Sequence, residues 1–139
     1  MDHNVEKWDY IEFDLKAQSE GNPFLDIHLE AEFSHGHRTV KVGGFYDGED
    51  NYRVRFMPDM EGEWQYVTQS NLAALDGHRG SFVCTPASGN NHGPVHVVDR
   101  YHFAYADGTP YHPVGTTCYV WNHQGDELEE KTLETLKSA

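Results

Sequence analysis

The 139-residue chain has few cationic side chains, and this shortage excludes several classes of partner. It contains 10 Lys and Arg residues against 23 Asp and Glu residues, which gives a formal net charge of −13. No cluster of basic residues offsets this charge, so phosphate backbones and anionic lipid head groups would be repelled. We therefore expect neither a nucleic-acid partner nor a membrane partner.

Long hydrophobic runs are also lacking, and cysteine is scarce. The first residues show no basic stretch followed by an apolar run, and no apolar run is long enough to span a bilayer. Cys84 and Cys118 are isolated, which is typical of reduced core thiols and not of a disulfide framework. These features favour a cytoplasmic protein without a redox or metal role for its thiols.

Apolar residues make up only 37% of the chain, but aromatic rings are plentiful. There are 3 Trp, 8 Tyr and 7 Phe residues, so the core must be built from large rings more than from aliphatic side chains. The length allows one domain of ordinary size, with at most a short second piece.

Apolar and polar residues alternate through most of the first hundred positions, which indicates β-strands with one buried face. The alternation is cleanest from Leu25 to Phe33, where Leu25, Ile27, Leu29, Ala31 and Phe33 would point inward. The same period predicts six further strands, near residues 10–16, 39–45, 52–57, 63–69, 81–85 and 95–98. Short turns rich in Gly, Asn and Pro favour antiparallel pairing, above all in a hairpin over 39–57. Seven short strands predict an all-β fold, an immunoglobulin-like or fibronectin-like antiparallel β-sandwich.

The pattern changes after residue 98. A hairpin is predicted around Asp107–Pro110, followed by a strand over Pro113–Val120 that does not alternate. A helix is predicted over Asp126–Lys137, with Asp126 as the N-cap and Glu129 three residues later. A buried strand followed by an amphipathic helix is typical of the first unit of a parallel α/β architecture.

Two sets of motifs resemble parts of one group of bacterial enzymes. Residues 5–98 are similar to the uncharacterised N-terminal β-sandwich domain that precedes the barrel in a group of bacterial glycoside hydrolases. The motifs that carry this resemblance are Gly44–Gly48, Tyr52–Pro58 and Glu61–Tyr66. Residues 101–137 are similar to the opening of the (β/α)₈ catalytic domain of the same group, through Phe103, Tyr105, Asp107–Pro110 and Val114–Gln124.

The resemblance implies two parts: an accessory sandwich over residues 1–98, and over 99–139 a hairpin, strand 1 and helix 1 of a truncated (β/α)₈ barrel. Trp121, Asn122 and His123 would then lie at the C-terminal end of strand 1, where barrel active sites are built, as a substrate subsite of the full-length enzyme. The catalytic carboxylates of such enzymes come from later strands. The chain would therefore hold no catalytic residue, and would be structural or substrate-guiding and inactive alone.

Two other functions remain open for the sandwich. Aromatic rings can stack on sugars, so a carbohydrate-binding module is the first alternative. Alternation predicts that Tyr52, Trp64 and Tyr66 lie in the core, and leaves Tyr10 and Tyr46 as exposed rings for sugar stacking. The second alternative is a protein-interaction sandwich.

Histidine is abundant, and His35 with His37 is the best candidate pair for a metal site. Zinc needs three or four ligands, and the sequence places no further ligand near them. We therefore expect solvated turn histidines and no metal. No phosphate loop or dinucleotide fingerprint predicts a cofactor.

The expected partners follow from the resemblance and from the tail. They are carbohydrate, through the full-length enzyme, and the remaining barrel of that enzyme. The tail would also expose an unpaired strand edge and apolar side chains, which favours a homodimer formed through the tail.

Overall fold

The structure is a computed structural model that describes residues 4–123 and 125–138. In chain order its elements are β1 (Asn4–Glu6), β2 (Ile11–Lys16), α1 (Pro23–Asp26), β3 (Leu29–His35), β4 (Arg38–Gly43), β5 (Phe45–Tyr46), β6 (Asn51–Phe56), β7 (Gly62–Ser70), β8 (Arg79–Thr85), β9 (Val95–Val98), β10 (His102–Tyr105), β11 (Pro110–Tyr111), the 3₁₀ helix η1 (Trp121–His123) and α2 (Asp126–Ser138). No helix in this described part is both long and apolar enough to cross a membrane.

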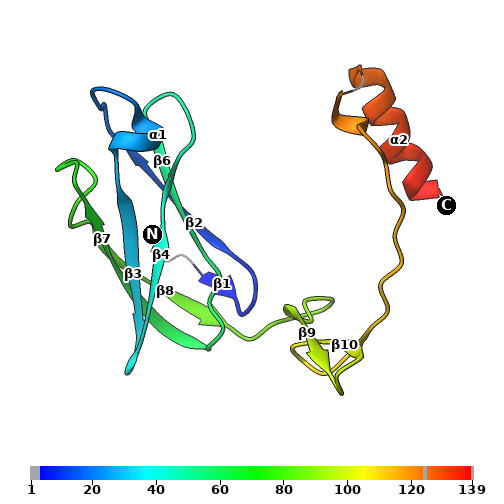
Figure 1. Cartoon of the computed structure of the whole chain (residues 1–139). Coiled ribbons are helices and arrows are strands. Elements are labelled where there is room, and N and C mark those ends of the chain that lie inside the picture. The colour runs from blue at the N-terminus through cyan, green and yellow to red at the C-terminus, as the bar shows by residue number, and fades with distance from the viewer. Residues whose placement is uncertain (1–3, 124, 139) are drawn as a thin grey trace.

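Two sheets face each other across one core (Figure 1). The larger sheet has the order β1-β8-β7-β3-β4 and the smaller one β2-β6-β5. All pairs are antiparallel except β1 with β8, which run parallel. The prediction of a predominantly β fold is confirmed.

Aromatic rings from both sheets fill the space between them. Phe33 on β3 and Phe56 on β6 stack with their ring centroids 4.0 Å apart. Trp64 on β7 is fully buried against Phe56 and donates its indole N–H to the Met60 carbonyl oxygen over 2.8 Å. Tyr52 is buried and Tyr66 partly buried in the same core, as the alternation predicts.

The predicted strand from Leu25 to Phe33 is wrong in its first half. The Asn22 side chain accepts a hydrogen bond from the Phe24 backbone N–H over 3.0 Å, and Pro23 occupies the first turn. This N-cap and proline start the one-turn helix α1. Leu25 is therefore 81% exposed, and strand β3 begins only at Leu29.

The predicted hairpin over residues 39–57 is confirmed only for β5 and β6. Strand β4 pairs with β3 in the larger sheet, whereas β5 pairs with β6 in the smaller one. The chain changes sheets at Gly44, where a Cβ atom would lie 2.6 Å from the Leu29 side chain. A glycine is needed there because the backbone passes directly against the core.

A third sheet of order β11-β10-β9 follows the sandwich. The hairpin predicted around Asp107 is present, as β10 and β11. Residues 95–98 form the predicted strand, but it pairs with β10 and not with a strand of the two facing sheets. Alternation indicates a strand without identifying its neighbour, and the last sandwich strand ends at Thr85.

The connection between the two facing sheets and the third sheet is held by the end of β1 and by the turn after it. The Glu6 carboxylate accepts hydrogen bonds from the Ser88 hydroxyl over 2.5 Å and from the Asn91 amide over 3.3 Å. These bonds hold the pKa of Glu6 below its usual range. The Trp8 ring packs so closely on Gly93 that a Cβ atom there would lie 2.5 Å from the ring.

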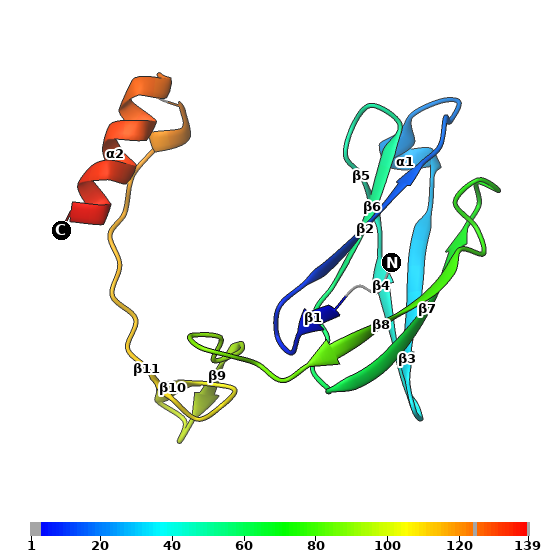
Figure 2. The same ribbon diagram turned by 180° about the vertical axis from the view of Figure 1, so that it is seen from behind.

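The strand predicted over Pro113–Val120 is absent. Residues 112–118 have no assigned secondary structure, and 119–120 form a turn. A strand exists only through hydrogen bonds to a neighbour, and in Figures 1 and 2 this segment and α2 stand apart from the sheets. Helix α2 begins at Asp126, as predicted, and ends at Ser138, one residue beyond the predicted end. The predicted N-cap role of Asp126 concerns a side chain that lies outside the described part of the structure.

Replacing the central ring of the core tests the packing. We expect Trp64→Ala to lower the free energy of unfolding by about 3 to 5 kcal/mol, because a buried ring is lost and a cavity remains. Urea denaturation measures the loss. The control is Tyr101→Ala, which removes a ring that is 83% exposed and should change stability by less than about 0.5 kcal/mol. Equal midpoints for the two variants would contradict this description of the core.

A second test concerns the hairpin at Asp107. His92 Nδ1 lies 2.7 Å from the Asp107 carboxylate, and the Thr109 backbone N–H donates to it over 2.9 Å. These bonds lower the pKa of Asp107 to about 2 from an ordinary 3.8. A depressed carboxyl pKa contributes stability that is complete above 3.8 and is lost as pH falls through 2.

The pKa itself can be followed in an NMR titration of the Asp107 carboxyl carbon. We expect a midpoint near 2, which rises toward 3.8 in His92→Ala because the hydrogen bond that lowers the pKa most is removed. A wild-type midpoint near 3.8, or one unmoved by His92→Ala, would contradict the hydrogen bond.

Candidate functional site

The residues predicted to form a sugar subsite lie together on η1. Trp121 is 37% exposed and the His123 backbone N–H donates to the Val120 carbonyl oxygen over 3.0 Å. The Asn122 side chain lies outside the described part. Figure 2 shows this segment far from the facing sheets, so it and the predicted sandwich rings do not form one site.

Tyr10 is exposed as predicted, whereas Tyr46 is not the free ring that was expected. Tyr10 is 63% exposed at the start of β2. Tyr46 is paired with Tyr52 in register, so its ring points to the core side of the sheet and packs on Tyr52 and Phe24 at centroid distances of 5.1 Å. Its hydroxyl also accepts a hydrogen bond from the Asp50 backbone N–H over 3.3 Å.

Phe45, which the sequence reasoning missed, is the exposed ring of strand β5. A shift of one residue along a strand moves a side chain to the opposite face. Phe45 therefore lies on the outer face of the smaller sheet, 38% exposed, opposite Arg53 in the register. The Arg55 guanidinium lies 5.1 Å from the centre of its ring, a cation–π contact.

A network of charges fixes the arginines on this outer face. The Glu12 carboxylate accepts hydrogen bonds from Arg55 Nε and, over 2.8 Å, from Arg53 Nη1. Arg53 Nε also makes ionic contacts of 2.9 Å to Asp47 and 3.1 Å to Asp14. Alternation places Glu12, Asp14, Arg53 and Arg55 outward because Phe13, Tyr52, Val54 and Phe56 on the same strands face the core, and Asp47 follows directly after β5.

The pKa directions of the network agree with this geometry. The hydrogen bond from Arg55 and the positive charge of Arg53 lower the pKa of Glu12, and the bond to Glu12 raises that of Arg55. Arg53 Nε is buried without a well-aligned hydrogen bond to any described residue, so its contacts to Asp14 and Asp47 are ionic. Glu12 and Arg55 therefore each favour the charged form of the other.

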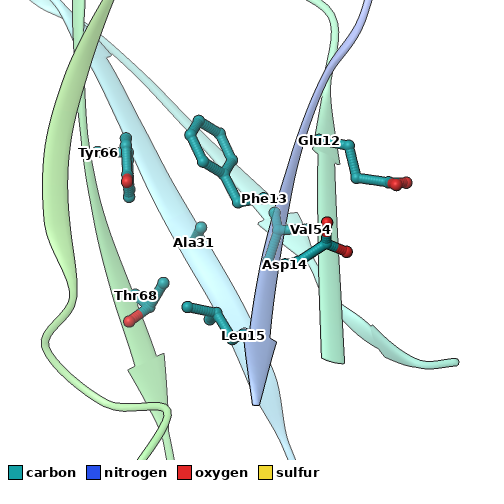
Figure 3. A pocket seen from close by; sticks show the side chains of 8 residues that line it. All are labelled: Glu12, Phe13, Asp14, Leu15, Ala31, Val54, Tyr66 and Thr68. Atoms are coloured by element: carbon teal, nitrogen blue, oxygen red, sulfur yellow. The ribbon is translucent and has the colours of Figure 1, made fainter. Parts of the chain in front are cut away.

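A cavity of about 480 Å³ opens between the two sheets beside β2. Its deep wall consists mainly of Phe13, Leu15, Ala31, Val54 and Tyr66. In Figure 3 the carboxylates of Glu12 and Asp14 point away from these side chains. The Thr68 hydroxyl already donates to the Leu75 carbonyl oxygen over 2.7 Å, so the cavity is apolar and has no pair of carboxylates for acid–base chemistry.

His35, one of the two histidines considered for metal binding, has a structural use. His35 Nδ1 donates to the Glu63 carbonyl oxygen over 2.8 Å, and its ring stacks on Trp64 with centroids 5.2 Å apart. Among the residues described, no three His, Cys, Asp or Glu side chains are grouped so that they could hold a metal ion.

Comparisons with known proteins agree with the motifs. Residues 4–71 match a family described as a domain of unknown function, DUF5060. The comparison with curated proteins found no match. Among solved structures, the chain is similar to the crystal structure of "a putative glycoside hydrolase from Bacteroides vulgatus ATCC 8482", with 48% identity and a TM-score of 0.90 over 96% of this chain. The chain spans 26% of the length of that protein. The resemblance indicated by the motifs, to an uncharacterised domain and to a bacterial glycoside hydrolase, is therefore confirmed.

Proposed function

We propose that the chain is the N-terminal part of a larger glycoside hydrolase, in which the sandwich is a non-catalytic accessory domain and the tail begins the catalytic barrel. The observation that carries this proposal is the similarity to the Bacteroides vulgatus protein, which extends over nearly all of this chain but only 26% of that one. The carbohydrate substrate would be bound and cleaved by the whole enzyme.

The strand order supports an immunoglobulin-like sandwich. In variable-type immunoglobulin domains one sheet contains strands G, F, C and C′, and the other contains B, E and D. Here β8-β7-β3-β4 and β2-β6-β5 follow these two orders when β2 to β8 are read as B to G. Strand β1 precedes B and pairs with the edge of G. We place the division between the two parts at residues 86–94, where the chain leaves the sandwich.

Exposed apolar side chains in the tail support the proposal that the tail is the start of a barrel. Val114 is 96% exposed, and Tyr119, Leu128, Leu133 and Leu136 are also exposed. An extended segment followed by a helix with an apolar stripe is suited to burial by neighbouring barrel units. Trp121, Asn122 and His123 would then lie at the active-site end of barrel strand 1, as a substrate subsite. The cytoplasmic location stays a prediction.

The proposal is tested by comparing this chain with a longer protein that continues through the barrel. We expect the chain alone to show no turnover of aryl glycosides, because the two catalytic carboxylates come from later barrel strands, and the longer protein to be active. Trp121→Ala in the longer protein should lower activity. An active chain, or a longer folded protein inactive on a broad set of aryl glycosides and oligosaccharides, would contradict the proposal.

The exposed tail also predicts self-association of the chain on its own. The extended segment after Tyr111 has no strand neighbour among the described residues, and unpaired backbone groups of that kind recruit strands from other chains. The tail also exposes apolar side chains, among them Val114, Tyr119, Leu128, Leu133 and Leu136. We expect sedimentation velocity to show dimers of the chain and monomers of a version ending at His112, which keeps the third sheet and lacks only the tail. The prediction is wrong if both proteins sediment as monomers and acrylamide quenches the fluorescence of Trp121 less than that of free indole. The tail would then be buried within one chain.

A further inference from the structure

The outer face of the smaller sheet combines two exposed rings with a fixed arginine between them. Tyr10 leads into β2, Phe45 lies on β5, and Arg55 lies on the central strand β6. The register pairs Arg55 with Glu12, and Arg53 with Phe45. Arg55 is therefore diagonal to both rings, a position from which long side chains can reach aromatic neighbours.

We propose that this face, formed by Tyr10, Phe45, Arg55 and Glu12, binds a neutral polysaccharide. Sugars present an apolar C–H face that stacks on aromatic rings and a rim of hydroxyls that need hydrogen-bond partners. Tyr10 and Phe45 supply the rings, and the guanidinium and carboxylate supply a donor and an acceptor. The proposal rests on the proposed function for its ligand class.

Arg55 is prepared for this role by its neighbours. Its Nε donates to Glu12, and its guanidinium carbon lies 5.1 Å from the centre of the Phe45 ring. Its hydrogen bonds among the described residues use Nε alone, so its two Nη groups keep donors that no described residue occupies. Because Glu12 is also held by Arg53, a sugar would meet groups that are already in position, and little side-chain entropy would be lost on binding.

The spacing of the rings selects an extended ligand. Tyr10 and Phe45 lie on opposite sides of the central strand β6, so they are roughly 10 Å apart across the sheet. Their positions in the register differ by four residues of β6, which is roughly 13 Å along the strands. A single sugar cannot stack on both rings, whereas an oligosaccharide of several residues can. The net charge of −13 excludes acidic polysaccharides as the favoured ligand.

Other exposed rings lack this combination. Phe24 packs edge-on against Tyr46, and Tyr101 lies in the turn between β9 and β10. Neither has a cation–π contact to a charged side chain among the described residues. Tyr101, which is more exposed than Tyr10, therefore serves as a control for non-specific stacking.

The first test is affinity electrophoresis of the chain in gels that contain xylan, mixed-linkage β-glucan or galactomannan. The second is calorimetry with oligosaccharides of the polysaccharide that slows the migration of the chain. We expect a hexasaccharide to bind at least about tenfold more tightly than the disaccharide, since only the longer ligand spans both rings. Tyr10→Ala and Phe45→Ala should each weaken hexasaccharide binding by about tenfold or more, and Tyr101→Ala should leave it unchanged. The melting temperatures of the three variants establish that they are folded.

The proposal is wrong if none of the three polysaccharides retards the chain, or if folded Tyr10→Ala and Phe45→Ala variants bind like the wild type. Its failure is distinguishable from failure of the proposed function. If the longer protein hydrolyses glycosides but this chain binds no polysaccharide, only the proposed binding face is contradicted. If the chain binds a polysaccharide through Tyr10 and Phe45 but the longer protein has no hydrolase activity, only the proposed enzymatic function is contradicted.

Discussion

Aromatic packing between the two sheets is the interaction on which the rest of the sandwich depends. Phe33 from one sheet and Phe56 from the other stack at 4.0 Å, with Trp64 buried beside them. Once Phe56 faces inward, strand geometry requires Arg55 to face outward. The core therefore determines the outer surface: each inward ring on β2, β5 and β6 specifies which neighbouring side chain meets solvent.

The sequence predicts most strands because the alternation of apolar and polar residues is a local signal. The prediction fails where a competing local interaction or the pairing with a distant strand determines the structure. Leu25 fits the alternation of β3, yet Asn22 and Pro23 start a helix at that point. Tyr46 and Phe45 illustrate a different limit. A strand of two residues has too little alternation to show which residue faces the core, and the pairing of Tyr46 with Tyr52 decides it. The charged network around Glu12 was not predictable either, because its members lie on β2, on β6 and directly after β5, and the sequence does not reveal how these segments pair.

The tail shows that strand formation is not a property of a segment alone. Residues 95–98 and the segment that follows Pro113 were both predicted as strands, but only the first has a neighbour, β10, to which it can pair. Asp107 stabilises this small sheet through the turn, with His92 and Thr109 as its partners. No comparable partner stands beside the segment from Pro113, so its backbone stays extended and unpaired among the described residues.

The contacts that join the two parts bear on how an accessory domain could guide a substrate. A binding face helps an enzyme only if its orientation to the active site is restricted, since a freely rotating domain would present the polysaccharide in every direction. Glu6, held by Ser88 and Asn91, and Trp8, packed on Gly93, attach the sandwich to the segment that leads into the third sheet. These contacts replace a flexible linker by side-chain packing and hydrogen bonds. If the outer face of β2, β6 and β5 binds a polysaccharide, the same contacts would fix the direction in which the bound polymer leaves this face relative to the third sheet and to the barrel that we propose follows it.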